Sequence, residues 1–281
     1  MAMKVLWAAA LLAYGASTGA AMDPRTAAVS SSSLLPLDMA PNSVDDMYDG
    51  CDEQMAEKVT MYLKNEKNAD PDFKKIWDNS LGSYDERRMN PTLEREQVIA
   101  LYAYTLDSKS IYQPLNRAVR TERFQYKTSF RFHALHFYLT RAVQKLNKLE
   151  GRCLKVYRRT KEPFRQDVVN TRVRLGSFTS SSMLTLEDHH LNAFGDKSCF
   201  EIETCMGADI STYSAYESEA EVLIPPYEVF TVTDMKEKSE QKDLPCDVVY
   251  TLKSTNEHVS NLNCALFPER SSVEKPKRAG S

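Results

Sequence analysis

The sequence predicts an α+β protein, because two kinds of hydrophobic pattern follow one another along its 281 residues. Between residues 52 and 148, apolar side chains recur every three or four positions, which is the period of an amphipathic helix. After Gly151 the chain changes to short segments rich in β-branched and aromatic residues, separated by Gly and Pro. Helices followed by strands are typical of the α+β class.

The first 21 residues have the pattern of a secretory signal peptide. Lys4 precedes an apolar stretch that ends at Tyr14, and small residues follow as far as Ala21. This stretch is too short to span a bilayer, so we expect cleavage near residues 19–21 rather than a retained helix. Residues 22–50 are rich in Ser, Ala, Pro and Asp, and we expect this segment to be partly flexible.

The helical half has recognisable start signals. Asp70-Pro71 and Asn90-Pro91 each resemble an N-cap followed by proline at the first helical position. The clearest helix covers residues 130–148, which carry a broad apolar stripe. His133 and His136 lie on or beside that stripe, so we interpret both as packing or surface histidines.

Seven segments of the second half have strand character. They are Leu154–Arg158, Arg172–Phe178, Cys199–Thr204, Glu221–Ile224, Tyr227–Thr233, Val248–Leu252 and Cys264–Phe267. No glycine-rich phosphate loop of the Rossmann or P-loop kind accompanies them.

Six cysteines in a secreted chain favour disulfides over free thiols. No Cys-x-x-Cys pair is present, and the five histidines do not flank cysteines at zinc spacing, so we expect no metal. Composition alone does not choose among the many pairings that six cysteines allow.

The net charge and the composition of the C-terminal residues indicate which kinds of partner and which location to expect. A net charge of −3 without a basic stripe argues against nucleic-acid binding. Residues 269–281 are polar and charged, so we expect a disordered tail and no lipid-anchor signal. No permitted Asn-x-Ser/Thr sequon is present. The mature protein is therefore expected to be released rather than anchored.

The stretch YSAYESEAEVLIPP, residues 213–226, combines crowded carboxylates with a buried strand. Glu217, Glu219 and Glu221 recur at every second position, which on an extended segment puts them on one face. Carboxylates that close raise the pKa of at least one of them. This arrangement suits a cation-like transition state; the alternative is a solvated acidic turn before a core strand.

Three polar features in the second half stand at strand edges, in the order Arg158, Ser180–Ser182, then Glu219 and Glu221. An Arg, a Ser and a Glu-x-Glu in this order resemble the arginine-specific mono-ADP-ribosyltransferases, in particular the vertebrate secreted and cell-surface enzymes. Taken singly, the Arg is a surface cation at a strand end and the serines are a polar strand. The likeness extends over nearly the whole mature chain, in the segments Leu37–Cys51, Ala100–Arg120, Phe130–Val143, Ala193–Phe230 and Asn261–Phe267.

The resemblance implies a helical N-terminal part packed on a two-sheet β core, with NAD bound between the sheets. It assigns Arg158 to an NAD phosphate, Ser180 to the first Ser of Ser-x-Ser, and Glu221 to catalysis. Glu219 corresponds to the glutamate linked to arginine as acceptor, and Phe194 to the aromatic that packs against nicotinamide.

The chain departs from the pattern at Arg159, where many relatives have Gly. This side chain has three alternative placements: it crowds NAD, adds a second phosphate contact, or points to solvent.

The resemblance also implies disulfides. The family pairs positions that match Cys51–Cys264 and Cys153–Cys205. By remainder, Cys199 and Cys246 would pair; the alternative is that one or both stay free.

The sequence as a whole therefore indicates a secreted, monomeric enzyme with one catalytic domain over residues 51–268. It would transfer ADP-ribose from NAD to arginine on extracellular or cell-surface proteins and release nicotinamide. Two alternatives stay open: an NAD glycohydrolase, and a catalytically silent NAD-binding protein of the same fold.

Overall fold

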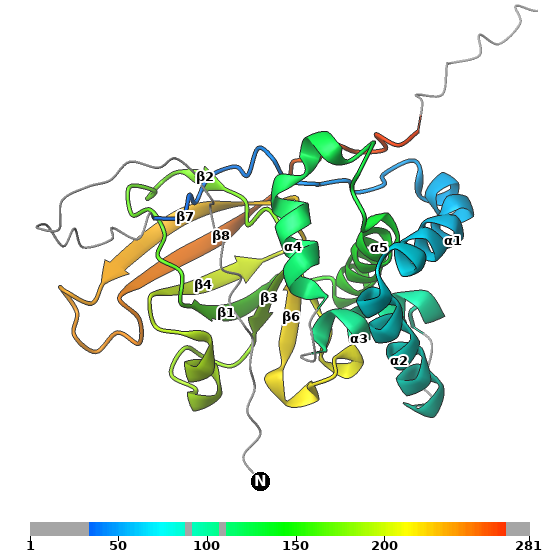
Figure 1. Ribbon diagram of the computed structural model, residues 1–281. Coiled ribbons are helices and arrows are strands. Elements are labelled where there is room, and N and C mark those ends of the chain that lie inside the picture. The colour runs from blue at the N-terminus through cyan, green and yellow to red at the C-terminus, as the bar shows by residue number, and fades with distance from the viewer. Residues whose placement is uncertain (1–33, 88–91, 107–110, 268–281) are drawn as a thin grey trace, which may run out of the picture.

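The structure is a computed structural model that describes residues 34–87, 92–106 and 111–267. The predicted signal peptide, the predicted Asn90-Pro91 helix start and the predicted tail at residues 269–281 lie outside these residues. Five α-helices precede the strands in the described part of the chain (Figure 1). They are α1 (Asp52–Ala69), α2 (Pro71–Arg87), α3 (Arg95–Thr105), α4 (Tyr112–Thr121) and α5 (His133–Glu150). None of the described helices is long and apolar enough to cross a membrane.

The helix boundaries follow from local chemistry. The Asp70 carboxylate accepts hydrogen bonds from the backbone N–H of Asp72 and Phe73, which confirms the predicted start of α2. At the other end of the helical half, α5 stops at Gly151, whose φ of 63° is left-handed. His133 and His136 are both buried on α5, and His136 Nδ1 lies 2.8 Å from the Tyr48 hydroxyl, so the packing interpretation is confirmed.

Eight strands follow the helices in the residues that the structure describes. They are β1 (Leu154–Thr160), β2 (Arg172–Val173), β3 (Thr179–Ser182), β4 (Ser198–Thr204), β5 (Ala208–Asp209), β6 (Glu221–Ile224), β7 (Glu228–Glu237) and β8 (Val248–His258). Short 3₁₀ turns connect some of them, including η2 (His189–Phe194), η3 (Ser211–Tyr213) and η4 (Glu217–Glu219). The α+β class is confirmed.

The strands are hydrogen-bonded in the order β2-β7-β8-β4-β1-β3-β6-β5, with β4 and β8 parallel. β1 and β3 share one registered pair, Tyr157 opposite Ser182, so the order divides there into a larger and a smaller sheet. Val222 and Ile224 of β6 share a buried cluster with residues of β1, β4, β7 and β8. The two sheets therefore face each other across this cluster, as the two-sheet expectation requires.

The other face of the small sheet packs on the helices. Leu223 and Ala208 belong to a second buried cluster, which contains the apolar faces of α1 to α5. Because neighbouring residues of a strand point to opposite faces, the run Val222-Leu223-Ile224 is buried on both sides. The small sheet is thus the middle layer between the helices and the larger sheet.

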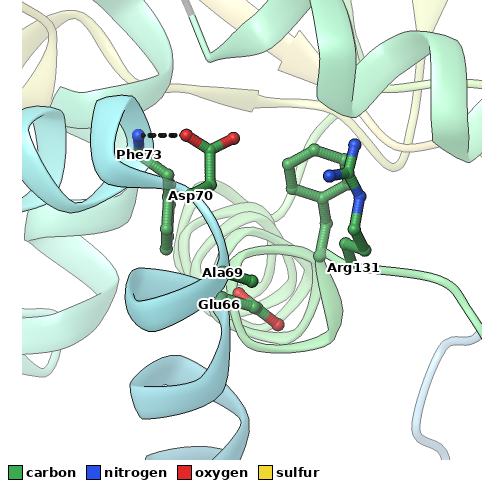
Figure 2. A pocket seen from close by; sticks show the side chains of 6 residues that line it. Glu66, Ala69, Asp70, Phe73 and Arg131 are labelled. Atoms are coloured by element: carbon green, nitrogen blue, oxygen red, sulfur yellow. Dashed lines mark hydrogen bonds between the residues drawn. The ribbon is translucent and has the colours of Figure 1, made fainter.

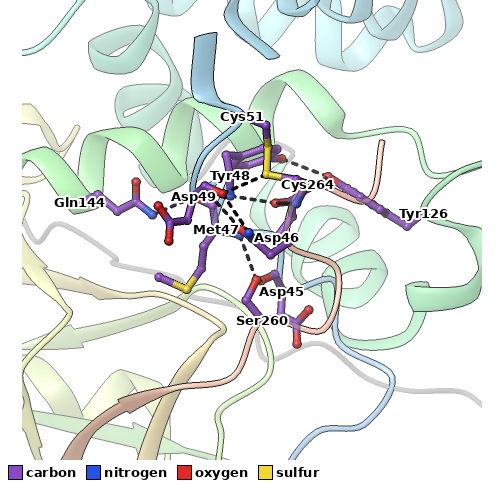
Figure 3. Close-up of a disulfide and its surroundings, with 11 residues drawn as sticks. Asp45, Asp46, Met47, Tyr48, Asp49, Cys51, Tyr126, Gln144, Ser260 and Cys264 are labelled. Atoms are coloured by element: carbon purple, nitrogen blue, oxygen red, sulfur yellow. Dashed lines mark hydrogen bonds between the residues drawn. A yellow bond between two sulfur atoms is a disulfide. The ribbon is translucent and has the colours of Figure 1, made fainter. Parts of the chain in front are cut away.

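The last predicted strand, Cys264–Phe267, is wrong. These residues form turns, and Cys264 has a φ of 58°. The Cys264 N–H donates to the Asp46 carboxylate, and its sulfur is bonded to Cys51 (Figure 3). These ties hold the segment against residues 45–51, where no neighbouring strand is available for pairing.

All three disulfides named above are present: Cys51–Cys264, Cys153–Cys205 and Cys199–Cys246. The last pair joins β4 to the connection between β7 and β8. The first joins the start of α1 to the segment after β8, over a sequence separation of 213 residues.

Residues 34–50 make specific contacts along the fold. Asp45 and Arg174 form an ion pair at 2.7 Å whose side chains are 0% and 1% exposed. Arg174 also donates to the carbonyls of Met39, Ala40 and Val259. This guanidinium therefore joins the N-terminal segment to the end of β8.

We expect Arg174→Ala to lower the free energy of unfolding by about 3–5 kcal/mol, because it leaves a buried carboxylate without its charge partner. Urea unfolding followed by circular dichroism measures this loss. The control is Arg172→Ala, two residues away, which removes an exposed pair with Glu257 and should cost about 0–1 kcal/mol. Equal losses in the two variants would contradict the assignment.

Candidate active site

The candidate site lies where β1 meets β3. Arg158 follows Tyr157 on β1, and its Nη1 donates to the Ser180 carbonyl of β3 at 2.5 Å. This contact fixes a partly buried guanidinium over the small sheet. Burial lowers the pKa of Arg158, and the nearby groups of Tyr104, Tyr112 and Glu221 oppose that shift.

Glu221 is the first residue of β6 and pairs with Ser182 of β3. Its backbone carbonyl accepts from Ile210 N–H, so hydrogen bonds on both sides hold its position. The side chain is only 2% exposed. Oε2 accepts from the Ser214 hydroxyl at 3.3 Å, whereas Oε1 is buried and has no hydrogen-bond partner among the described residues.

This environment makes Glu221 a weak acid. Burial raises its pKa to about 8, and the charge of Glu219 adds to the increase. Ser180, Ser214 and Arg158 act in the opposite direction, since each stabilises the carboxylate form. The expectation that crowded carboxylates raise at least one pKa holds in direction, although burial is the larger cause.

The predicted row of three glutamates on one extended face is wrong. Glu217–Glu219 forms the 3₁₀ turn η4, and Ala220 has a left-handed φ of 47°. The Ser182 hydroxyl donates to the Glu219 carbonyl at 2.6 Å and holds this turn against β3. Glu217 is therefore exposed, while Glu219 remains close enough for its charge to affect Glu221.

Ser180 contributes a buried hydroxyl to this group. The residue is 8% exposed, and its Oγ has no hydrogen bond of standard geometry among the described residues. It lies close enough to Glu221 and Tyr104 to lower the pKa of each. A buried hydroxyl between an acid and a phenol can turn its proton toward either group.

Sequence reasoning missed three residues of the site: Ser214, Tyr104 and Arg120. Burial raises the pKa of Tyr104, on α3, to about 12, and its hydroxyl donates to the Phe178 carbonyl. Arg120, on α4, donates to the Ser177 hydroxyl at 2.6 Å. Burial lowers the pKa of Arg120, and the charge of Arg158 is the second largest cause of this decrease. Two cations therefore lie in the same region. The family-like segment Ala100–Arg120 contained two of these residues, but no motif marked them.

Comparison with known proteins identifies the family. Residues 37–256 match the family described as NAD:arginine ADP-ribosyltransferase. This chain belongs to that family.

Relatives and solved structures agree with the assignment. Human ecto-ADP-ribosyltransferase 5 is 36% identical over 264 residues, which cover 88% of this chain and 87% of the relative. Rat T-cell ecto-ADP-ribosyltransferase 1 is 38% identical over 203 residues, covering 70% of each chain. The crystal structure of a glutamate-to-alanine mutant of the eukaryotic mono-ADP-ribosyltransferase ART2.2 with NADH superposes with a TM-score of 0.69. It is 33% identical, with coverage of 82% of this chain and 98% of the other.

Family and fold are thus those of an NAD-using ADP-ribosyltransferase. Of the residues that the sequence singled out in this transferase, the structure brings Arg158, Ser180, Glu219 and Glu221 together. Phe194 lies at the end of η2, which packs against β1, the strand of Arg158.

Arg159 does not point to solvent, which removes one of its three alternative placements. The residue is 8% exposed, and neighbouring residues of a strand point to opposite sides, so it lies behind β1 relative to Arg158. Its Nε donates to the Gly195 carbonyl at 2.7 Å. Arg159 therefore neither occupies the site of Arg158 nor points to solvent.

A small pocket elsewhere in the transferase is structural. It lies between the end of α1, the start of α2 and the segment before α5 (Figure 2). Its lining residues are Glu66, Ala69, Asp70, Phe73, Arg131 and Phe132. Glu66 accepts from Ala134 N–H in the first turn of α5, and burial raises its pKa to about 8. The pocket shares no residue with the candidate site.

The raised pKa of Glu221 predicts how stability changes with pH. The folded protein keeps a proton on Glu221 up to about pH 8, while the unfolded chain loses it near the ordinary value of 4.5. Stability is therefore lost as pH rises between these values. We expect Glu221→Gln to lose less stability than the wild type over this range in urea unfolding. Glu217→Gln, which removes an exposed carboxyl, should follow the wild type; parallel curves for all three proteins would contradict the assignment.

Proposed function

We propose that this protein transfers ADP-ribose from NAD to arginine side chains of extracellular proteins and releases nicotinamide. The observation that carries the proposal is the buried Glu221 carboxyl, held beside Ser180 and Arg158 at the junction of the two sheets. A carboxyl fixed in this way offers, in its ionised form, a negative charge whose position does not depend on the substrate.

The reaction breaks the bond between nicotinamide and the ribose carbon, and the bonding electrons leave with nicotinamide. Positive charge then develops on the ribose, as in glycoside cleavage. In the free protein Glu221 holds a proton near neutral pH, and the positive charge of the nicotinamide ring of bound NAD would favour its ionised form. The ionised carboxylate then stabilises the charge on the ribose more strongly as it grows, which lowers the barrier instead of merely tightening NAD binding. Ser180 and Ser214 orient the carboxylate and favour its ionised form.

Arg158 is proposed to bind a phosphate of NAD, because its planar fork can donate two parallel hydrogen bonds. Arg120 supplies a second positive charge nearby. Two cations match the two phosphates of a dinucleotide. Phe194 would pack against the nicotinamide ring.

Glu219 is proposed to hold the acceptor. An arginine guanidinium is always protonated and is a poor nucleophile. A carboxylate on η4, next to Glu221, can pair with it, orient one nitrogen toward the ribose carbon, and take the proton that the new C–N bond releases.

The proposal extends to the organisation and location of the protein. We infer one catalytic domain over residues 51–268, with residues 34–50 held on it through the Asp45–Arg174 pair. Several relatives are ecto-enzymes, and a mouse relative is GPI-linked. The signal-peptide pattern of residues 1–21 supports the secreted location that we propose, and we propose that the protein is a monomer.

Glu221→Gln tests the proposal directly. We expect nicotinamide release from NAD to fall by about 10²–10³-fold, because the amide cannot stabilise the developing charge. Release is measured by chromatography on the wild type, Glu221→Gln and the exposed control Glu217→Gln. The proposal is rejected if Glu221→Gln keeps the wild-type rate.

Glu219→Gln separates transfer from hydrolysis. We expect this variant to lose ADP-ribosylation of agmatine while it still forms free ADP-ribose, because water needs no carboxylate to position it. Both products are quantified from one incubation with NAD and agmatine. Full transfer to agmatine by the variant would remove Glu219 from the acceptor role, and free ADP-ribose as the sole wild-type product would establish an NAD glycohydrolase.

A further inference from the structure

We propose that Arg159 is a positioning residue, which fixes the loop bearing Phe194 against β1 and thereby sets the affinity for NAD. The effect on NAD affinity rests on the proposed function, whereas the attachment of the loop to β1 rests on contacts within the chain.

Four of the five N–H groups of the Arg159 guanidinium donate to acceptors within the chain. Besides Gly195, its Nη1 donates to Asn192 Oδ1 at 2.6 Å and to the Leu186 carbonyl at 3.3 Å. Its Nη2 donates to the Pro245 carbonyl at 3.2 Å. All four acceptors are neutral, so the cation is held by directed hydrogen bonds rather than by a carboxylate.

Three of these acceptors belong to one segment. Leu186, Asn192 and Gly195 lie in the connection between β3 and β4, which contains η2 and Phe194. The backbone hydrogen bonds of residues 185–195 are local, such as Asp188 N–H to Thr185 and Leu191 N–H to Asp188, and the long-range ones lie at the ends of the connection, at residues 183 and 196–197. Arg159 therefore fastens an irregular segment to a regular strand at three points.

The fourth acceptor, the Pro245 carbonyl, belongs to a different part of the chain from the other three. We call Arg159 with its four acceptors the clamp. Pro245 precedes Cys246, which is bonded to Cys199, and Cys199 pairs with Arg159 across β1 and β4. Leu186 packs in the same buried cluster as both cysteines. The arginine thus holds the connection between a strand and a disulfide-bonded turn.

The position of Phe194 follows from this clamp, because Phe194 directly precedes Gly195. Gly195 has a φ of 126°, and a Cβ there would lie 2.6 Å from the backbone of Thr160 and Lys161. Only glycine permits this close approach to the end of β1. Arg159 holds the Gly195 carbonyl on one side while the β1 backbone packs against the residue on the other, so the preceding aromatic ring has little freedom.

The experiment compares Arg159→Gly, Arg159→Lys and Asn192→Ala with Lys155→Gly, a control that places glycine at an exposed position of the same strand. Hydrogen–deuterium exchange of residues 185–195 measures the loop, and equilibrium dialysis in a Glu221→Gln background measures NAD binding without turnover. We expect Arg159→Gly to speed exchange in the loop and to raise the Kd for NAD by about tenfold. The KM for agmatine and the melting temperature of the rest of the fold should change little.

Arg159→Lys should fall between the wild type and Arg159→Gly, because an ammonium cannot span four acceptors. Asn192→Ala removes one acceptor and should give a smaller change in the same direction, which keeps the test valid if Arg159→Gly does not fold. Unchanged exchange in the loop, or faster exchange with an unchanged Kd for NAD, would overturn the inference. If the Glu221→Gln parent does not bind NAD and the wild type does not release nicotinamide, the proposed function is refuted instead. The rate of hydrogen–deuterium exchange in residues 185–195 would still test whether Arg159 holds the loop.

Discussion

The junction between β1 and β3 is the constraint on which the site depends. One registered pair, Tyr157 with Ser182, and one side-chain contact, Arg158 with the Ser180 carbonyl, join the larger sheet to the smaller one. Because β3 also pairs with β6, this junction sets where Glu221 lies relative to Arg158. A shift of β3 by one residue would turn Ser180 and Ser182 to the opposite face and separate the cation from the acid.

Burial of Glu221 shows a conflict between folding and chemistry. An acid with an unpaired buried oxygen and a pKa near 8 destabilises the folded protein at neutral pH relative to an ordinary solvated carboxyl. The surrounding small sheet, packed on both faces, maintains the position despite that cost. Such a poised group is typical of a catalytic site, where strongly shifted pKa values concentrate.

Much of this architecture was predictable from the sequence, for identifiable reasons. Asp70 and Pro71 act through local contacts, so the start of α2 could be predicted. The short apolar run Val222-Leu223-Ile224 has the pattern of a strand that is buried on both faces. The Glu217–Glu221 row could not be predicted correctly, because a period of two does not reveal that Ala220 adopts a left-handed conformation. Tyr104 and Arg120 reach the site from helices that lie far from Glu221 in the sequence. Only the tertiary packing shows that these two side chains belong to the site. Only the packing also shows that Arg159 is buried on the opposite side of β1 from Arg158.

The disulfide between Cys51 and Cys264 turns almost the whole described chain into a covalent ring. A protease that cuts once at an exposed turn inside that ring, such as the one at residues 240–242, produces two pieces that cannot diffuse apart. The nicked molecule would migrate as a single species until its disulfides are reduced. Release of a fragment from the ring needs two cuts, and the smaller bridges nested inside it restrict even that outcome to a few places along the backbone.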